Sequence, residues 1–79
     1  MNVQQLKNFL RVAEIGSISR AAMELRIAQP ALSQQIRRLE EELGVPLFRR
    51  DGRGVVLTEA GQRFKERAKT ILREFGSDR

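Results

Sequence analysis

The sequence predicts a mainly α-helical domain that contains one two-stranded β-hairpin. Apolar residues recur at helical spacing in four segments, and glycine or proline stands near most of the boundaries between them. After the third segment the pattern changes to two short apolar runs separated by Asp-Gly-Arg-Gly. Because glycine accepts the positive φ that tight hairpin turns require, this stretch predicts two paired strands.

Composition limits the function classes that the chain can serve. Its 79 residues suffice for one small domain, and it contains no cysteine and no histidine. Disulfides, thiol nucleophiles and the commonest zinc ligands are therefore excluded, and no nucleophile and base pair stands out. We expect no enzyme, no cofactor and no bound metal. Fifteen Lys and Arg against ten Asp and Glu give a net charge of +5, which suits nucleic acid or an acidic membrane surface.

The first residues, MNVQQLKNFLRVAE, alternate polar and apolar side chains and contain no long apolar run. This pattern is neither that of a signal peptide nor that of a membrane span. We therefore expect a cytoplasmic protein without a membrane partner.

The first helix is expected from about residue 3 to residue 14. Asn2 can cap it, with Gln5 three residues later completing a capping box, and Gly16 can end it in the left-handed conformation. Its apolar side chains fall at i, i+3, i+4 and i+7, namely Leu6, Phe9, Leu10 and Ala13.

A short second helix is expected to start after Ser17 or Ser19 and to end near Leu25. It contains two residues that are small enough to let another helix approach closely, Ala21 and Ala22. Only Arg26-Ile27-Ala28 separates it from the next helical pattern, so the two helices must cross steeply.

The third helix is expected to be capped by Gln29, with Pro30 at its first position, where the missing amide of proline has no partner. Gly44 closes it. One narrow apolar stripe runs along it, formed by Leu32, Ile36, Leu39 and Leu43. Near its N-terminus, small apolar, amide and guanidinium groups face away from the stripe, namely Pro30, Ala31, Ser33, Gln34 and Arg37.

These groups are of the kinds that contact base edges in the major groove, which admits an α-helix. An amide pairs with adenine, a guanidinium with guanine, and a small apolar group touches the thymine methyl. The acidic run 40–42 lies at the other end of the helix. The alternative is a merely solvated face, in which Arg38 pairs with Glu41 or Glu42. Taken alone, the helix favours that alternative.

The hairpin is expected to pair Leu47–Arg50 with Val55–Leu57. Three guanidinium groups would project from this small protrusion, those of Arg49, Arg50 and Arg53. An arginine on a thin arm can enter the narrow minor groove while its neighbours contact phosphates. The alternative is an ordinary exposed hairpin, in which Asp51 pairs with one of the arginines.

The last helix is expected to be capped by Thr58 and to run from Glu59 to about Phe75. Its apolar stripe, which is the candidate dimerisation surface, consists of Phe64, Ala68, Ile71, Leu72 and Phe75. The first part of the stripe can pack on the first helix, whereas Ile71, Leu72 and Phe75 are expected to extend beyond so small a core and to contact a second subunit. The periodicity equally allows the whole stripe to pack within the chain.

Taken together, these segments resemble the N-terminal winged helix-turn-helix of LysR-type transcriptional regulators. The resemblance rests on AA-x-x-L-x-I-x-Q-P-x-L-S-x-x-I-x-x-L-E-x-x-L-G, followed by L-F-x-R, a glycine-containing turn and L-T-x-A-G. It covers essentially the whole chain. It implies a winged helix-turn-helix DNA-binding domain with a two-stranded β wing over residues 1–58, and a long C-terminal linker helix over 59–79 that pairs two subunits.

The resemblance also implies roles for single residues. The third helix, from Gln29 and Pro30 through Ser33, Gln34 and Arg37, becomes the recognition helix, and Arg50 and Arg53 become wing contacts. The implied partner is double-stranded operator DNA, bound by a homodimer. In the family an effector-binding domain follows this module, so we expect any small-molecule effector to act only through a domain that this chain lacks.

Three positions depart from the family pattern. Ala28 stands where many members have Ser or Thr, Arg26 stands in the turn where helix-turn-helix motifs often have glycine, and Gln34 replaces an arginine of some relatives. Arg26 would be strained if that position needs a positive φ. The rival interpretation of the whole chain is a basic interaction or dimerisation module that docks an acidic partner without specific DNA binding.

Overall fold

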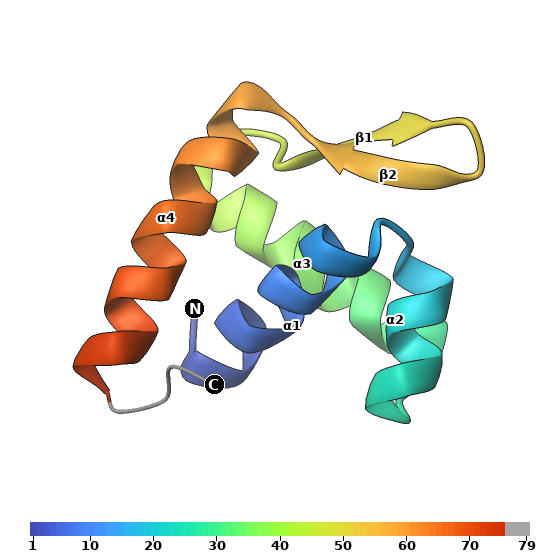
Figure 1. Cartoon of the computed structure of the whole chain (residues 1–79), viewed down its shortest axis with the longest axis horizontal. Helices are drawn as coiled ribbons and strands as arrows, with labels where there is room; N and C mark the ends of the chain where they lie inside the picture. The colour runs from blue at the N-terminus through green and yellow to red at the C-terminus, as the bar shows by residue number, and fades with distance from the viewer. Residues whose placement is uncertain (76–79) are drawn as a thin grey trace.

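The computed structural model describes residues 1–75. Its elements are, in chain order, α1 (Val3–Ile15), α2 (Ile18–Leu25), α3 (Gln29–Leu43), β1 (Phe48–Asp51), β2 (Gly54–Leu57) and α4 (Glu59–Glu74). Figure 1 shows α1 and α3 at the centre, with α2 and α4 at opposite ends of the molecule and the hairpin along one side. The mainly α-helical fold with a two-stranded antiparallel hairpin is confirmed. Residues 76–79 of the expected linker helix lie outside the described residues.

Local side-chain contacts define the ends of the first two helices. Asn2 Oδ1 accepts a hydrogen bond from the Gln5 amide at 2.8 Å, and Gln5 Oε1 accepts one from the Asn2 amide at 3.1 Å. Gly16 ends α1 in the left-handed region at φ 79°. Ser17, not Ser19, caps α2 by accepting from the Arg20 amide at 3.2 Å. The expected caps of α1 are therefore confirmed.

The cap of α3 differs from the expectation. Ala28 is the N-cap, because its carbonyl accepts the first helical hydrogen bonds, from the amides of Ala31 at 3.0 Å and Leu32 at 3.1 Å. Gln29 is already helical, and its amide group donates to Ser33 Oγ at 2.9 Å. The prediction that Gln29 caps the helix is therefore wrong. Proline fits the second helical position as well as the first, since neither amide has a helical partner.

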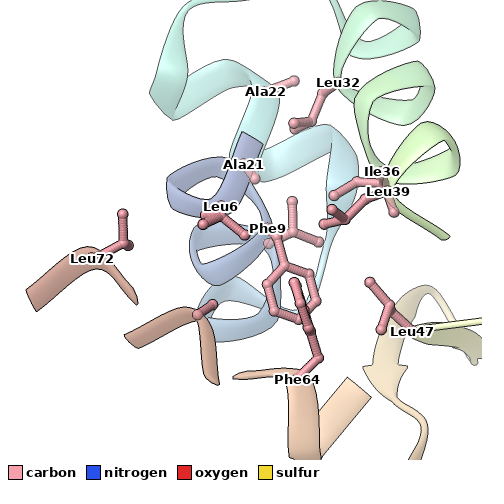
Figure 2. Packing of buried hydrophobic residues seen from close by; sticks show 12 residues of the cluster. Leu6, Phe9, Ala21, Ala22, Leu32, Ile36, Leu39, Leu47, Phe64 and Leu72 are labelled. Atoms are coloured by element: carbon pink, nitrogen blue, oxygen red, sulfur yellow. The ribbon is translucent and has the colours of Figure 1, made fainter. Parts of the chain in front are cut away.

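The core joins all four helices to the start of the hairpin. The ring centroid of Phe9 lies 5.4 Å from that of Phe48 in β1 and 5.3 Å from that of Phe64 in α4. Figure 2 shows Phe9 at the centre of the buried side chains, next to Phe64. The first pair is tilted and the second is edge-to-face, and such pairs add to the stabilisation from burial of apolar area. The buried apolar residues are Leu6, Phe9, Val12, Ala21, Ala22, Leu32, Ile36, Leu39, Leu47, Phe64, Ala68 and Leu72.

The stripe of α4 lies mostly inside this core. Phe64, Ala68 and Leu72 are buried in the single chain, because α4 packs against α1. The expectation that Leu72 extends beyond the core is therefore wrong. All three side chains are buried within the single chain, without a second subunit. Ile71 is half-buried, and Phe75 is 66% exposed at the end of the helix.

The first strand begins one residue later than expected, at Phe48, and the second begins one residue earlier, at Gly54, because the pairing runs from Phe48 with Leu57 to Asp51 with Gly54. Leu47 is instead fully buried in the core. Arg50 pairs with Val55 and Asp51 pairs with Gly54, which leaves Gly52-Arg53 as the two-residue turn. Gly52 has a φ of 61°, as such turns require. The Val55 amide donates to the Gly16 carbonyl at 3.0 Å, so β2 is fixed to the junction between α1 and α2.

Candidate nucleic-acid interface

The N-terminal half of α3 presents the side chains that the sequence singled out. Gln29, Pro30, Ala31, Gln34 and Arg37 are exposed and Ser33 is half-buried. The buried residues of α3 lie on its opposite side, as an amphipathic helix requires. The structure therefore places these six residues on one accessible face.

Arg37 of this face and the neighbouring Arg38 have no acidic partners within residues 1–75. The alternative in which Arg38 pairs with Glu41 or Glu42 is not observed there. Glu42 instead lies 2.8 Å from the amino group of Met1. Arg37 and Arg38 thus remain available to an external anion.

Glu40 of α3 binds the segment that begins the hairpin. Its Oε2 accepts hydrogen bonds from the amides of Leu47 at 2.7 Å and Phe48 at 3.3 Å. Thr58 completes the anchorage, because its amide donates to the Leu47 carbonyl at 2.9 Å and its hydroxyl to the Pro46 carbonyl at 2.7 Å. The start and the end of the hairpin are thereby fixed to α3 and α4.

The hairpin presents its arginines to solvent. Arg49, Arg50 and Arg53 are all exposed, with Arg53 in the turn at the tip. Asp51 forms no ion pair within the described part of the chain, so the alternative of a locally neutralised wing is not observed there. In Figure 1 the turn of the hairpin and the N-terminal end of α3 both lie toward the side of the molecule opposite α4. The two predicted contact regions therefore share one end of the fold.

The turn between α2 and α3 determines where that face lies. The amide of Arg26 donates to the Met23 carbonyl at 3.2 Å, and the amide of Ile27 donates to the Ala22 carbonyl at 3.0 Å. This is the Schellman arrangement, which ends a helix within one residue, and Ile27 packs against the core as its apolar contact. Arg26 has a φ of 60°, so the position does need the left-handed conformation.

The order of elements and the turn geometry agree with one family of regulators. The family model described as "Bacterial regulatory helix-turn-helix protein, lysR family" matches residues 3–62. The chain belongs to this family. In this LysR-family chain, α2 and α3 form the helix-turn-helix and the hairpin is the wing.

Individual relatives are regulators of the same kind. The LysR-family chain is 57% identical over 72 residues to the HTH-type transcriptional regulator BudR of Klebsiella aerogenes, covering 91% of this chain and 50% of that protein. It is 50% identical over 74 residues to the nitrogen assimilation regulatory protein nac of the same species, covering 94% and 24% respectively. The chain therefore spans half the length of BudR and 24% of the length of nac. Both are described as regulators rather than as enzymes.

Solved structures show the same fold. The chain in the CbnR_DBD-DNA complex is 45% identical and superposes with a TM-score of 0.90, over 96% of this chain and 87% of that one. The chain in the BenM_DBD/benA site 1 DNA complex is 42% identical, with a TM-score of 0.88 over 96% and 88%. Both structures are DNA complexes of those proteins.

One polar pair beside α3 of this LysR-family chain was not predicted from the sequence. Asn8 is only 3% exposed, and its Nδ2 donates to Gln35 Oε1 at 2.6 Å. Gln4 Nε2 donates to Asn8 Oδ1 at 3.0 Å. The hydrogen bond between Asn8 and Gln35 joins α1 to α3, and Gln35 is the residue next to Gln34. A polar residue four positions before the buried Val12 is the only sequence signal that could have indicated it.

An ion-pair cluster ties α1 to α2 on the surface. Arg11 hydrogen-bonds to Glu24 through Nε and to Glu14 at 2.6 Å through Nη1. The hydrogen bond with Glu24, followed by that with Glu14, raises the pKa of Arg11. The same bond holds the pKa of Glu24 below its ordinary value. Both groups are accessible to solvent, so the cluster contributes little to stability.

Two kinds of feature are missing from residues 1–75. No group of three or more His, Cys, Asp or Glu side chains in this range could hold a metal ion. No helix in the same range is long and apolar enough to cross a membrane.

Proposed function

We propose that the chain binds double-stranded DNA sequence-specifically, as the DNA-binding module of a dimeric LysR-type transcriptional regulator in the bacterial cytoplasm. The observation that carries this proposal is the exposed N-terminal face of α3, which presents the amides of Gln29 and Gln34 and the guanidinium of Arg37. Arg37 forms no ion pair in the described range. These are the side chains that pair with purine edges in the major groove.

In the proposed complex, α3 lies in the major groove and the hairpin reaches the adjacent minor groove. Gln29 and Gln34 offer amides to adenine, while Pro30 and Ala31 offer apolar contacts to thymine methyl groups. Ser33 is already hydrogen-bonded to Gln29, so it orients that amide and can also donate to a phosphate. Arg37 lies one turn further along the helix, facing guanine or the backbone.

The wing contributes charge rather than base readout. Arg53 at the tip is proposed to enter the minor groove, where the negative potential is concentrated, and Arg50 is proposed to contact a phosphate. Glu40 and Thr58 anchor the hairpin to the helices, so the arginines are presented on a fixed support. Because the hairpin is already held in place, less conformational entropy is lost when it binds DNA.

Dimerisation is proposed to use the exposed end of α4. Since Phe64, Ala68 and Leu72 are buried inside the chain, Ile71 and Phe75 are the members of the stripe that can reach a second subunit. We propose residues 1–58 as the DNA-binding part and 59–79 as the linker. Any small-molecule effector is proposed to act through the part of the longer relatives that this chain does not match.

Selection of bound duplexes from a random pool, with the protein mass measured in solution, tests the proposal. We expect a partly two-fold symmetric motif and a dimer mass at the concentrations that give binding. The rival function, docking of an acidic protein, predicts no retarded band with any duplex and no salt-dependent release of phosphate contacts. A pool that returns no sequence bias would contradict the proposal.

A further inference from the structure

Arg26 holds a backbone conformation that arginine adopts at a cost. It is the non-glycine residue with positive φ in residues 1–75, at 60°, whereas the comparable ends of α1 and α3 use Gly16 and Gly44. The left-handed conformation costs an L-residue roughly 1–2 kcal/mol, which glycine avoids. The Schellman turn needs only the backbone of this residue, so glycine would serve the fold at least as well.

No side-chain contact within the described chain compensates for this strain. The Arg26 side chain is exposed, and within residues 1–75 it forms no ion pair and no side-chain hydrogen bond. A cation at the end of α2 gains only a few tenths of a kcal/mol to about 1 kcal/mol from the helix dipole when exposed. Strained residues that the fold itself does not require are candidates for a functional role.

The position of Arg26 indicates what that role is. The residue lies in the turn, three positions before Gln29, where α3 begins its exposed face. In the proposed complex the start of α3 enters the major groove, and a groove is bordered by phosphates on both sides. In that complex a guanidinium at this point would lie beside the backbone rather than the base edges, where guanidinium groups bind phosphate oxygens with two parallel hydrogen bonds.

We propose that Arg26 is a phosphate anchor, kept in a strained turn because its charge positions the recognition helix on the duplex. This inference rests on the proposed function. It assigns to Arg26 a sequence-independent contribution to affinity, in addition to the arginines of the wing. The predicted consequence is a trade-off, since the substitution that relieves the backbone strain also removes the contact.

Three variants separate the effect of the charge from that of the backbone strain. Arg26→Gly removes the charge and relieves the strain, whereas Arg26→Gln removes the charge and keeps a side chain on the strained backbone. Arg26→Lys keeps both the charge and the strained backbone. Each is unfolded in urea and titrated with a selected duplex and with a random duplex over a series of salt concentrations. For Arg26→Gly we expect the unfolding constant to fall about 2- to 5-fold, the net of the relieved strain and the entropy of glycine.

For Arg26→Gly and Arg26→Gln we expect affinity to fall about tenfold on both duplexes, with the slope of log Kobs against log salt smaller by about 0.9. Arg26→Lys is expected to keep that slope. Unchanged affinity and slope in Arg26→Gly would overturn the inference while leaving the proposed function intact. A loss confined to the selected duplex, or a loss of stability alone in Arg26→Gln, would also overturn it. If the unmodified chain retards no duplex, the proposed function fails and the anchor fails with it.

Discussion

The α-carbon of Gly61 in α4 lies against the carbonyl oxygen of Leu47, so closely that a Cβ added to Gly61 would overlap that oxygen. The same carbonyl accepts the amide of Thr58 at 2.9 Å. The start of α4 is therefore packed directly onto the segment that leads into the hairpin, and the two cannot separate to admit a side chain without breaking this bond.

Gly61→Ala is expected to destabilise the fold, although alanine is the better helix former by about 1 kcal/mol. The overlap with the Leu47 carbonyl outweighs that preference, and we expect a net loss of about 1–3 kcal/mol in the free energy of unfolding. Urea denaturation measures it. The neighbouring Gln62→Ala, on an exposed position of the same turn, serves as the control and should change stability by less than about 0.5 kcal/mol. A Gly61→Ala variant more stable than the parent would contradict the close approach.

Leu72 and Phe75 are expected to behave differently, although they belong to one stripe. Leu72→Ala opens a cavity between α4 and α1 and should lower the free energy of unfolding by about 2–4 kcal/mol. Phe75→Ser should leave the stability of the monomer nearly unchanged, because this ring is exposed, but should weaken dimerisation. Sedimentation equilibrium beside urea denaturation distinguishes the two effects. An unchanged dimer constant in Phe75→Ser would exclude this end of α4 from the interface.

Gln34 and Arg53 are expected to contribute in different ways to DNA binding. Gln34→Ala removes a base-reading amide, so it should reduce discrimination between selected and random duplexes by about 1–3 kcal/mol and leave the salt dependence in place. Arg53→Ala should weaken binding to most sequences and reduce the salt slope by about 0.9. Titrations of both duplexes at several salt concentrations measure these effects. Equal losses on both duplexes for Gln34→Ala would refute its role.

Acid is expected to weaken the contact between α1 and α2. Hydrogen bonding to Arg11 lowers the pKa of Glu24 in the folded chain, so the ionised carboxylate stabilises the fold at a pH above the unfolded value of about 4.3. That contribution is lost as the pH falls through the lowered pKa. The stability difference between the parent and Glu24→Gln should therefore be present at neutral pH and disappear in acid.

Urea denaturation at low ionic strength measures this difference, because salt screens exposed pairs. Glu66→Gln is the matched control, since the Glu66 carboxylate is exposed and forms no ion pair within residues 1–75. A parent and a Glu24→Gln variant with parallel stability curves down to strong acid would show that the Arg11 contact contributes nothing in solution.

Local chemistry made most of the fold predictable. The capping box at Asn2, the left-handed glycines at 16 and 44, and Thr58 act on residues within a few positions of themselves, so the sequence pattern contains their effect. The exposed face of α3 was predictable for the same reason, because its buried stripe has helical period. The cap of α3 was assigned one residue too late because proline suits either of the first two positions.

Features that depend on the packing of distant segments were not predictable. The sequence does not show how far the contact between α4 and α1 extends, and that contact buries Leu72 while Phe75 stays exposed. Asn8 and Gln35 are far apart in the sequence, and neither reveals the other. The need for glycine at 61 arises from Leu47 and likewise becomes visible only in three dimensions.

A crystal structure of the chain bound to a selected duplex tests the central claim most directly. We predict two copies of the chain on one site, each with Gln29 and Gln34 within hydrogen-bond distance of base edges in the major groove and Arg53 in the adjacent minor groove. A complex in which the N-terminal face of α3 turns away from the bases would contradict that prediction.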